Sequence, residues 1–216
     1  MKKNIIISLF FLILSTIILS YLHHKIINLD LLQIEEASKT LTKTQINKIL
    51  VQESNNEYLN FIVVSISTLI KVIIISLVIY IGAFLFNLKI SFKKLLSLVI
   101  KLEYIFLLPI VYEIIYFKFI NTSATLEDIQ FFYALSALNI VGYKGLETWF
   151  IYPLQVLNLF ELAYWLLLSY FIGKLAFTEK DKGKPMDLGF KIVASSYGSA
   201  LLLWVVVVMF FTLNYS

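Results

Sequence analysis

Residues 61–86 read FIVVSISTLIKVIIISLVIYIGAFLF, and this stretch decides the class of fold. A single charge, at Lys71, interrupts an otherwise apolar run. A helix needs about 20 apolar residues to cross the roughly 30 Å of hydrocarbon in a bilayer. Inside lipid the backbone must satisfy its own hydrogen bonds, and a helix does so within one segment. The stretch therefore predicts a transmembrane helix.

The composition of the whole chain agrees with this prediction. The protein has 216 residues, of which 60% are hydrophobic and 15% are charged. A soluble domain is about 45 to 50% apolar and about 25% charged, so one soluble core could not hide the excess. The sequence predicts an all-α fold, a polytopic transmembrane helical bundle in which residues 1–216 form a single membrane domain.

Four more apolar stretches have the length of a membrane span, at about residues 4–22, 95–117, 151–172 and 192–213. Five spans are therefore predicted. The first follows Lys2 and Lys3, a pattern that a secretory signal peptide would also show. Because its apolar run is long and no small-x-small cleavage site follows it, an uncleaved helix is the favoured interpretation.

Two long loops separate these spans. In residues 23–60, apolar side chains at helical spacing predict an amphipathic helix, followed by a short helical piece and a polar turn at 54–56. Such a helix either lies on the membrane surface, caps the bundle or contacts a partner. Residues 118–150 are hardly polar, and TLED at 125–128 resembles a helix N-terminal cap. We expect both loops to be amphipathic and to lie outside the membrane.

The lysines predict the orientation, because lysines near the ends of spans favour the cytoplasm. Eleven lie on one predicted side, against six on the longer loops of the other side. The eleven are Lys2, Lys3, Lys89, Lys93, Lys94, Lys101, Lys174, Lys180, Lys182, Lys184 and Lys191. The N-terminus is therefore predicted inside and the C-terminus outside, in the inner (cytoplasmic) membrane of a bacterium.

Two features concern the shape and packing of the predicted helices. Pro109 lacks a backbone donor and predicts a kink in the third span. Small residues recur four apart in the fifth span and predict close packing against another helix of the same chain. They are Ala194, Ser195, Gly198 and Ser199.

Ionisable groups inside a membrane are candidate functional residues, because a charge near the centre costs about 2.5 to 3.5 kcal/mol even on the lenient insertion scale. Lys71 and Glu161 lie at similar depths when residues are counted from the predicted span ends, so they are predicted to pair. Gln155, Asn158 and Glu161 recur at helical spacing and predict one polar face on the fourth span.

Two interpretations of these polar residues inside the membrane remain open. They form either a structural ion pair that fixes how two spans dock, which we favour, or a proton or ion site. The absence of a second carboxylate or of a broken helix weighs against transport. Glu103 is predicted nearer the cytoplasmic end, solvated or paired with Lys101, and Glu113 near the outer end.

The sequence gives no support for catalysis. It contains no cysteine and no arginine, and its two histidines, His23 and His24, lie just outside the first span. No metal-binding motif, phosphate-binding glycine loop or nucleic-acid motif occurs. We therefore predict no catalytic, cofactor-binding or metal-binding residue, no cofactor, no nucleic-acid partner and no identifiable small-molecule substrate.

Two classes of function remain for a non-enzymatic membrane bundle. The favoured hypothesis is an accessory or scaffold subunit of a larger membrane assembly, whose partners are the bilayer and other membrane subunits. The alternative is a permease, or an ion- or proton-coupled transporter subunit, that uses Lys71 and Glu161. An odd number of spans without an internal repeat does not form two inverted halves, which disfavours a self-contained transporter.

Three short stretches resemble the Yip1-type membrane family, particularly its bacterial members. They are SFKKLL at 91–96, LNLFELAYW at 157–165 and KIVASSYG at 191–198, which leads into the helix of Trp204. The resemblance covers about residues 90–213. It implies a five-helix membrane bundle without enzymatic activity, and it transfers no catalytic residue. The 38-residue first loop, residues 23–60, departs from the family pattern.

Overall fold

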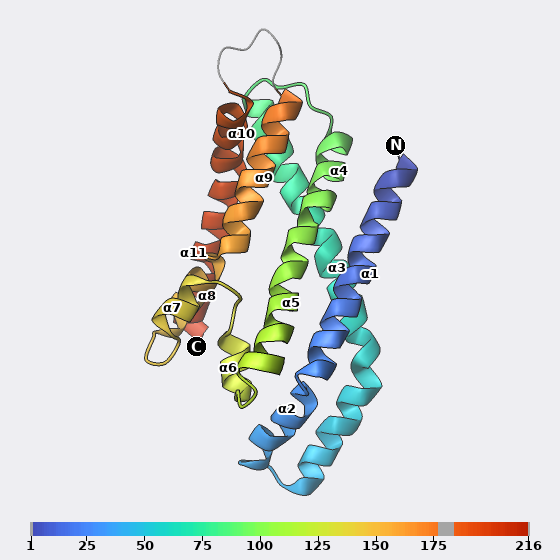
Figure 1. Cartoon of the computed structure of the whole chain (residues 1–216), viewed down its shortest axis with the longest axis vertical. Helices are drawn as coiled ribbons and strands as arrows, with labels where there is room; N and C mark the ends of the chain where they lie inside the picture. The colour runs from blue at the N-terminus through green and yellow to red at the C-terminus, as the bar shows by residue number, and fades with distance from the viewer. Residues whose placement is uncertain (1, 177–183, 216) are drawn as a thin grey trace.

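The computed structural model describes residues 2–176 and 184–215, and within them the chain is built from helices (Figure 1). Five helical segments of the described residues are long and apolar enough to cross a membrane: Asn4–Ile26, Tyr58–Leu85, Phe92–Ile120, Leu159–Ala176 and Pro185–Tyr215. The prediction of an all-helical chain with five spans is confirmed, and the chain is a multi-pass membrane protein. The N-in orientation stays a prediction, and two lysines used for it, Lys180 and Lys182, lie outside the described residues.

The first third of the chain folds into three helices, α1 (Lys2–Ile26), α2 (Leu29–Ser38) and α3 (Lys43–Leu85). The amphipathic helix predicted in the first loop corresponds to α2. The turn predicted at 54–56 is wrong, because α3 runs through it without a break. A capping box at Thr42 and Gln45 starts this helix, and no proline or glycine interrupts it before Gly82.

The third span departs from α-helical geometry at two places. It consists of α4 (Phe92–Leu102), a 3₁₀ turn (Glu103–Phe106), α5 (Leu107–Ile115) and a π-helical turn (Tyr116–Ile120). Pro109 cannot donate to the carbonyl of Ile105, and its ring crowds that carbonyl. Ile105 lies within the 3₁₀ turn, so the expected disturbance in this span is a local tightening of the helix.

The fourth predicted span is two helices rather than one. The chain forms α6 (Leu126–Phe131), α7 (Ala137–Val141), α8 (Thr148–Val156) and α9 (Leu159–Ala176). The prediction of one helix over 151–172 is wrong at residues 157 and 158. There the Ala137 N–H donates to the Leu157 carbonyl, and the Leu159 N–H donates to the Leu135 carbonyl. These bonds to a distant segment replace the helical ones and break the span.

The fifth span consists of α10 (Pro185–Val193), a π-helical turn (Ala194–Gly198) and α11 (Ser199–Tyr215). Helices α9 and α10 lie side by side, and α11 continues past them to pack on α8 (Figure 1). A Cβ added at Gly173 would overlap the Pro185 carbonyl, and one at Gly189 would overlap the Ser169 carbonyl. The backbones of α9 and α10 are therefore in close contact at these two glycines, while the predicted small residue Gly198 packs against the Trp165 ring.

The apolar core joins α3, α4, α9 and α10. Its side chains are fully or almost fully buried: Ile75, Ile79, Leu95, Val99, Ile100, Leu168, Ile172, Ile192 and Val193. Helices α4, α9 and α10 lie toward the end of the bundle where α1 begins, while α2 and α6 lie at the opposite end (Figure 1). In contrast, α11 contributes no buried residue. The bundle is thus tightly packed at the end where α1 begins, and its helices are more exposed toward the end where α2 lies.

The loop before α8 is held by a polar cap at its start. The Thr125 N–H and hydroxyl donate to Asp128 Oδ2 at 2.9 and 2.7 Å, and the Tyr143 hydroxyl donates to Oδ1 at 2.8 Å. The cap predicted at 125–128 is confirmed. These donors lower the pKa of Asp128 below its usual value, while burial and then the bond to Asp128 raise the pKa of Tyr143 to about 12.

We expect the cap at Asp128 to make this loop sensitive to acid. A carboxyl whose pKa is lowered by folding stabilises the fold above its unfolded pKa, and that stabilisation is lost as the pH falls through the lowered value. The substitution Tyr143→Phe should raise the Asp128 pKa toward the ordinary value and cost about 1 kcal/mol. Carboxyl NMR titration in nanodiscs measures the shift. Tyr215→Phe, at an exposed site, is the control, and an unchanged Asp128 titration in Tyr143→Phe contradicts the assignment.

Candidate functional site

A charged pair lies in the middle of the membrane-spanning part of the bundle. Lys71 Nζ on α3 lies 2.8 Å from Glu103 Oε2, at the first residue of the 3₁₀ turn. The Glu103 side chain is 5% exposed and the Lys71 side chain 45% exposed. The Lys71 ammonium also lies 3.7 Å from the centre of the Phe106 ring, a favourable cation–π contact.

This pair corrects the predicted Lys71–Glu161 contact and the predicted solvation of Glu103 or its pairing with Lys101. Helices α3 and α4 are joined by the short link of residues 86–91 and pack as neighbours. Positions at similar distances from such a link meet, and Lys71 and Glu103 lie about 21 and about 17 Å from it at 1.5 Å per residue. Counting from the link, rather than from the predicted span ends, would have identified Glu103 as the partner.

Glu161 lies in the first turn of α9, directly after the break in the fourth span. Its carboxyl Oε1 accepts hydrogen bonds from Trp165 Nε1 at 2.9 Å and from the Tyr197 hydroxyl at 2.7 Å. Its backbone N–H donates to Asn158 Oδ1 at 2.8 Å, the geometry of an N-terminal cap. The break thus places a capped helix start and a carboxyl inside the bundle.

Aromatic rings connect the two carboxyl groups. The ring centres of Phe106 and Tyr164 are 4.9 Å apart, and those of Tyr164 and Tyr197 are 5.6 Å apart. Tyr164 is completely buried, and its hydroxyl interacts electrostatically with Glu103 and with Glu161. Neither the Tyr164 hydroxyl nor Glu103 Oε1 has a hydrogen-bond partner among the described residues. We call Lys71, Glu103, Glu161, Tyr164 and Tyr197 the polar cluster.

Of the other predicted polar residues, Asn158 contacts the cluster only as the cap of the Glu161 backbone N–H. Gln155 lies on α8 before the break, and its Nε2 donates to the Phe131 carbonyl at 3.4 Å. Asn158 donates from Nδ2 to the Gln155 and Val156 carbonyls at 2.9 and 3.0 Å. The predicted continuous polar face of the fourth span is therefore replaced by a hydrogen-bonded break, which the sequence spacing does not reveal.

Glu113 lies apart from the polar cluster, toward the α2 end of the bundle. Its Oε2 is 3.1 Å from His23 Nε2, and both side chains are 18% exposed. This contact joins α5 to the end of α1. No third ionisable side chain of the described residues takes part in this contact. The described residues hold no group of three histidine, cysteine or carboxylate side chains arranged for a metal ion.

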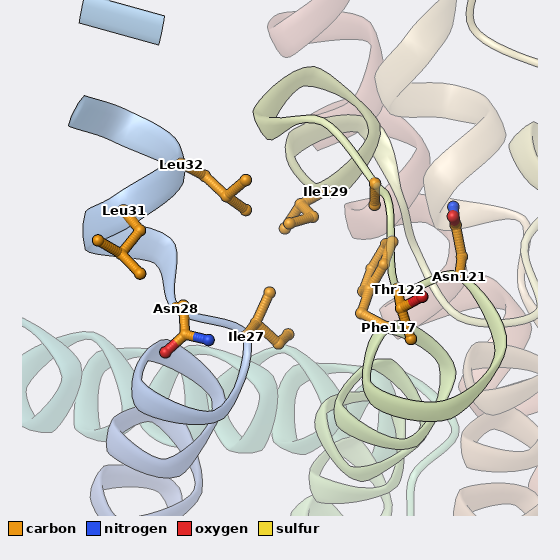
Figure 2. A pocket seen from close by; sticks show the side chains of 9 residues that line it. Ile27, Asn28, Leu31, Leu32, Phe117, Asn121, Thr122 and Ile129 are labelled. Atoms are coloured by element: carbon orange, nitrogen blue, oxygen red, sulfur yellow. The ribbon is translucent and has the colours of Figure 1, made fainter. Parts of the chain in front are cut away.

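A separate cavity of about 230 Å³ lies at the α2 end, between α2, the π-helical turn and α6. Figure 2 shows Leu32 and Ile129 pointing into it from opposite sides. Its lining is largely apolar: Ile27, Asn28, Leu31, Leu32, Phe117, Asn121, Thr122, Ala124 and Ile129. None of these residues belongs to the polar cluster, so the cavity and the cluster are distinct features.

Comparisons with known proteins do not add to this picture. No family model matches the chain, and neither the comparison with curated proteins nor that with solved structures finds a match. The chemistry of the polar cluster must therefore be argued from its own geometry. Two carboxyl groups, one ammonium and two tyrosines can hold charge or a proton.

The substitution Tyr197→Phe tests how far the bond to Glu161 stabilises the fold. We expect the free energy of unfolding to fall by about 1 kcal/mol, because one buried hydrogen bond is lost while Trp165 still donates to the same oxygen. Reversible unfolding in mixed micelles, followed by tryptophan fluorescence, measures the change. Tyr170→Phe removes a hydroxyl from an exposed tyrosine and should have almost no effect. Equal losses in the two variants would argue against a stabilising bond.

Proposed function

We propose that this chain is a non-enzymatic integral membrane subunit, accessory or scaffolding, that acts within a larger membrane assembly. The observation that carries the proposal is the exposure of Lys71. Its side chain is 45% exposed about midway along a membrane span. Contact of such a group with lipid costs about 2.5 to 3.5 kcal/mol, and a polar surface of a partner subunit would remove that cost.

The surface around Lys71 supports this proposal. Ile70, Ile74 and Leu77 on the same helix are exposed, so the lysine lies within a continuous accessible strip of α3. Helix α1, which packs against α3, buries little of its surface in the chain itself, and α11 contributes no buried residue. The resemblance to the Yip1-type family and the N-in orientation in a bacterial inner membrane are parts of the same proposal.

Photo-crosslinking tests whether a protein covers Lys71 in the native membrane. A photoreactive amino acid at Ile74, one turn from Lys71, should give one crosslinked protein product of defined mass in a stoichiometric complex. The control is the same amino acid at Phe210 on α11, also exposed. Crosslinks from position 74 only to lipid, together with a native mass equal to one chain, would overturn the proposal.

A second candidate, an ion- or proton-coupled transporter subunit using Lys71 and Glu161, has a specific observation in its favour. The fourth span is broken, and the start of α9 presents Glu161 to the interior near a second carboxyl, Glu103. Broken helices at mid-membrane depth form the binding sites of many secondary transporters. Proton flux into liposomes by the purified chain, lost in Glu161→Gln, would support this candidate. Flux equal to that of empty liposomes, with or without co-purified subunits, would exclude it.

A further inference from the structure

The charges of the polar cluster do not balance. One ammonium, Lys71, lies among two carboxyl groups, Glu103 and Glu161, in the membrane-spanning part of the bundle. Ionisation of all three groups would leave one net negative charge in a low-dielectric interior, which is strongly unfavourable without a compensating cation. One carboxyl must therefore either bind a proton or recruit a cation.

We propose that the Glu161 carboxyl binds an exchangeable proton in the folded protein at neutral pH, while Glu103 stays ionised in its pair with Lys71. The assignment goes beyond the proposed function, because it concerns the chain itself and holds whether or not a partner is bound. The ligand of the site is a proton, and the site is Glu161 together with the donors that surround its Oε1.

The ion pair decides which of the two carboxyl groups stays charged. Lys71 Nζ lies 2.8 Å from Glu103 Oε2, and the Phe106 ring covers the same ammonium. At this distance two opposite charges attract each other strongly where the effective dielectric constant is low. Glu161 makes no such contact with Lys71, although the charges of Lys71 and Glu103 both act on it. Glu103 thus holds the counter-ion, and Glu161 is left to be neutral.

The hydrogen bonds of Glu161 leave one of its two oxygens without a donor. Trp165 and Tyr197 both donate to Oε1, and the carbonyl oxygen of a neutral carboxylic acid has two lone pairs that can accept both bonds. No group of the described residues donates to Oε2, which leaves that oxygen to carry the proton. The start of α9 favours a negative charge at Glu161. Lys71, however, already pairs with Glu103, so it does not neutralise an ionised Glu161 as well.

Titratable groups surround Glu161 on several elements of the structure. The titratable groups that act on it, or on which it acts, are Lys71, Glu103, Tyr133, Tyr152, Tyr164 and Tyr197. Of these, Tyr164 is fully buried with a hydroxyl that lacks a hydrogen-bond partner among the described residues, as does Glu103 Oε1. Tyr164 interacts electrostatically with Glu103 and with Glu161, so it connects the surroundings of the two carboxyl groups.

Infrared spectroscopy of the chain in nanodiscs tests the proposal directly, because a protonated carboxylic acid gives a carbonyl stretching band that a carboxylate lacks. We expect one such band at pH 7, with a shift in deuterium oxide that shows exchange. Glu161→Gln should abolish the band. Circular dichroism verifies that the variant keeps its helical content, since glutamine can accept the same two hydrogen bonds.

Loss of the band in Glu161→Gln does not by itself show which of the two carboxyl groups carries the proton in the wild type. Once Glu161 is replaced, Glu103 would be ionised in its pair with Lys71, whichever group was protonated before. Tyr197→Phe does distinguish them. It removes a donor from the Glu161 carbonyl and should move the band to higher wavenumber, whereas Tyr164→Phe should leave the band in place. A wild-type spectrum without the band, a band that persists in Glu161→Gln, or one that Tyr197→Phe leaves unmoved would each overturn the assignment.

Discussion

The substitution Lys71→Ala is expected to lower the free energy of unfolding by about 3 kcal/mol, the largest effect of any change in the polar cluster. Removing one partner of a buried ion pair leaves the other charge uncompensated, and such losses are about 3 to 5 kcal/mol. We place the effect at the lower end because Lys71 is half exposed and Glu103 can take up a proton. Unfolding in mixed micelles and protein abundance in the membrane measure the loss.

Double variants distinguish the observed pair from the one predicted from sequence. The charge-reversed variant Lys71→Glu/Glu103→Lys should recover much of the stability lost in either single variant, whereas Lys71→Glu/Glu161→Lys should not. Lys71→Met/Glu103→Met should also be close to wild type, because apolar replacement of a whole buried pair is often neutral. Lys101→Ala, at an exposed position on α4, is the matched single-site control. If Glu161→Lys restored the stability lost in Lys71→Glu and Glu103→Lys did not, the Lys71–Glu103 assignment would be contradicted.

The second large effect is expected at the contact of α9 and α10. Gly173→Ala and Gly189→Ala each place a methyl group on a backbone carbonyl of the facing helix, Pro185 or Ser169. Overpacking costs about 1 to 3 kcal/mol, and we expect about 3 kcal/mol here because backbone atoms cannot rotate away as a side chain can. Unfolding in mixed micelles again provides the measurement.

Spin labels can show whether the loss at these glycines comes from helix separation. The chain contains no cysteine, so labelled cysteines at the exposed positions Tyr170 and Phe190 report only the α9–α10 distance. That distance should increase in Gly173→Ala and stay constant in Ser195→Ala, a control at an exposed position of the next turn. A stable Gly173→Ala variant with an unchanged distance would show that the contact is looser than described.

Both predictions concern contacts that the sequence indicated only in part. Lys71 and Glu161 were predicted to pair because they lie at similar depths, but depth says nothing about direction around a helix axis. Each residue turns by about 100° around the helix axis, so the depth of Lys71 does not show which residue of a neighbouring helix faces it. Similarly, small residues were predicted to mediate packing in the fifth span, whereas the close contact between the α9 and α10 backbones uses Gly173 and Gly189.

The sequence by itself determined that the chain has five apolar helical segments able to cross a membrane, that residues 125–128 cap a helix, and that Lys71 lies inside a span. Hydropathy and capping are local properties, so residues near one another in sequence suffice to predict them. Only the tertiary structure decided the break at Asn158, because the backbone bonds that replace the helical ones come from residues 135–137. It also decided that Glu103 neutralises Lys71 and leaves Glu161 to its own donors, since the orientation of each helix in the bundle depends on its neighbours.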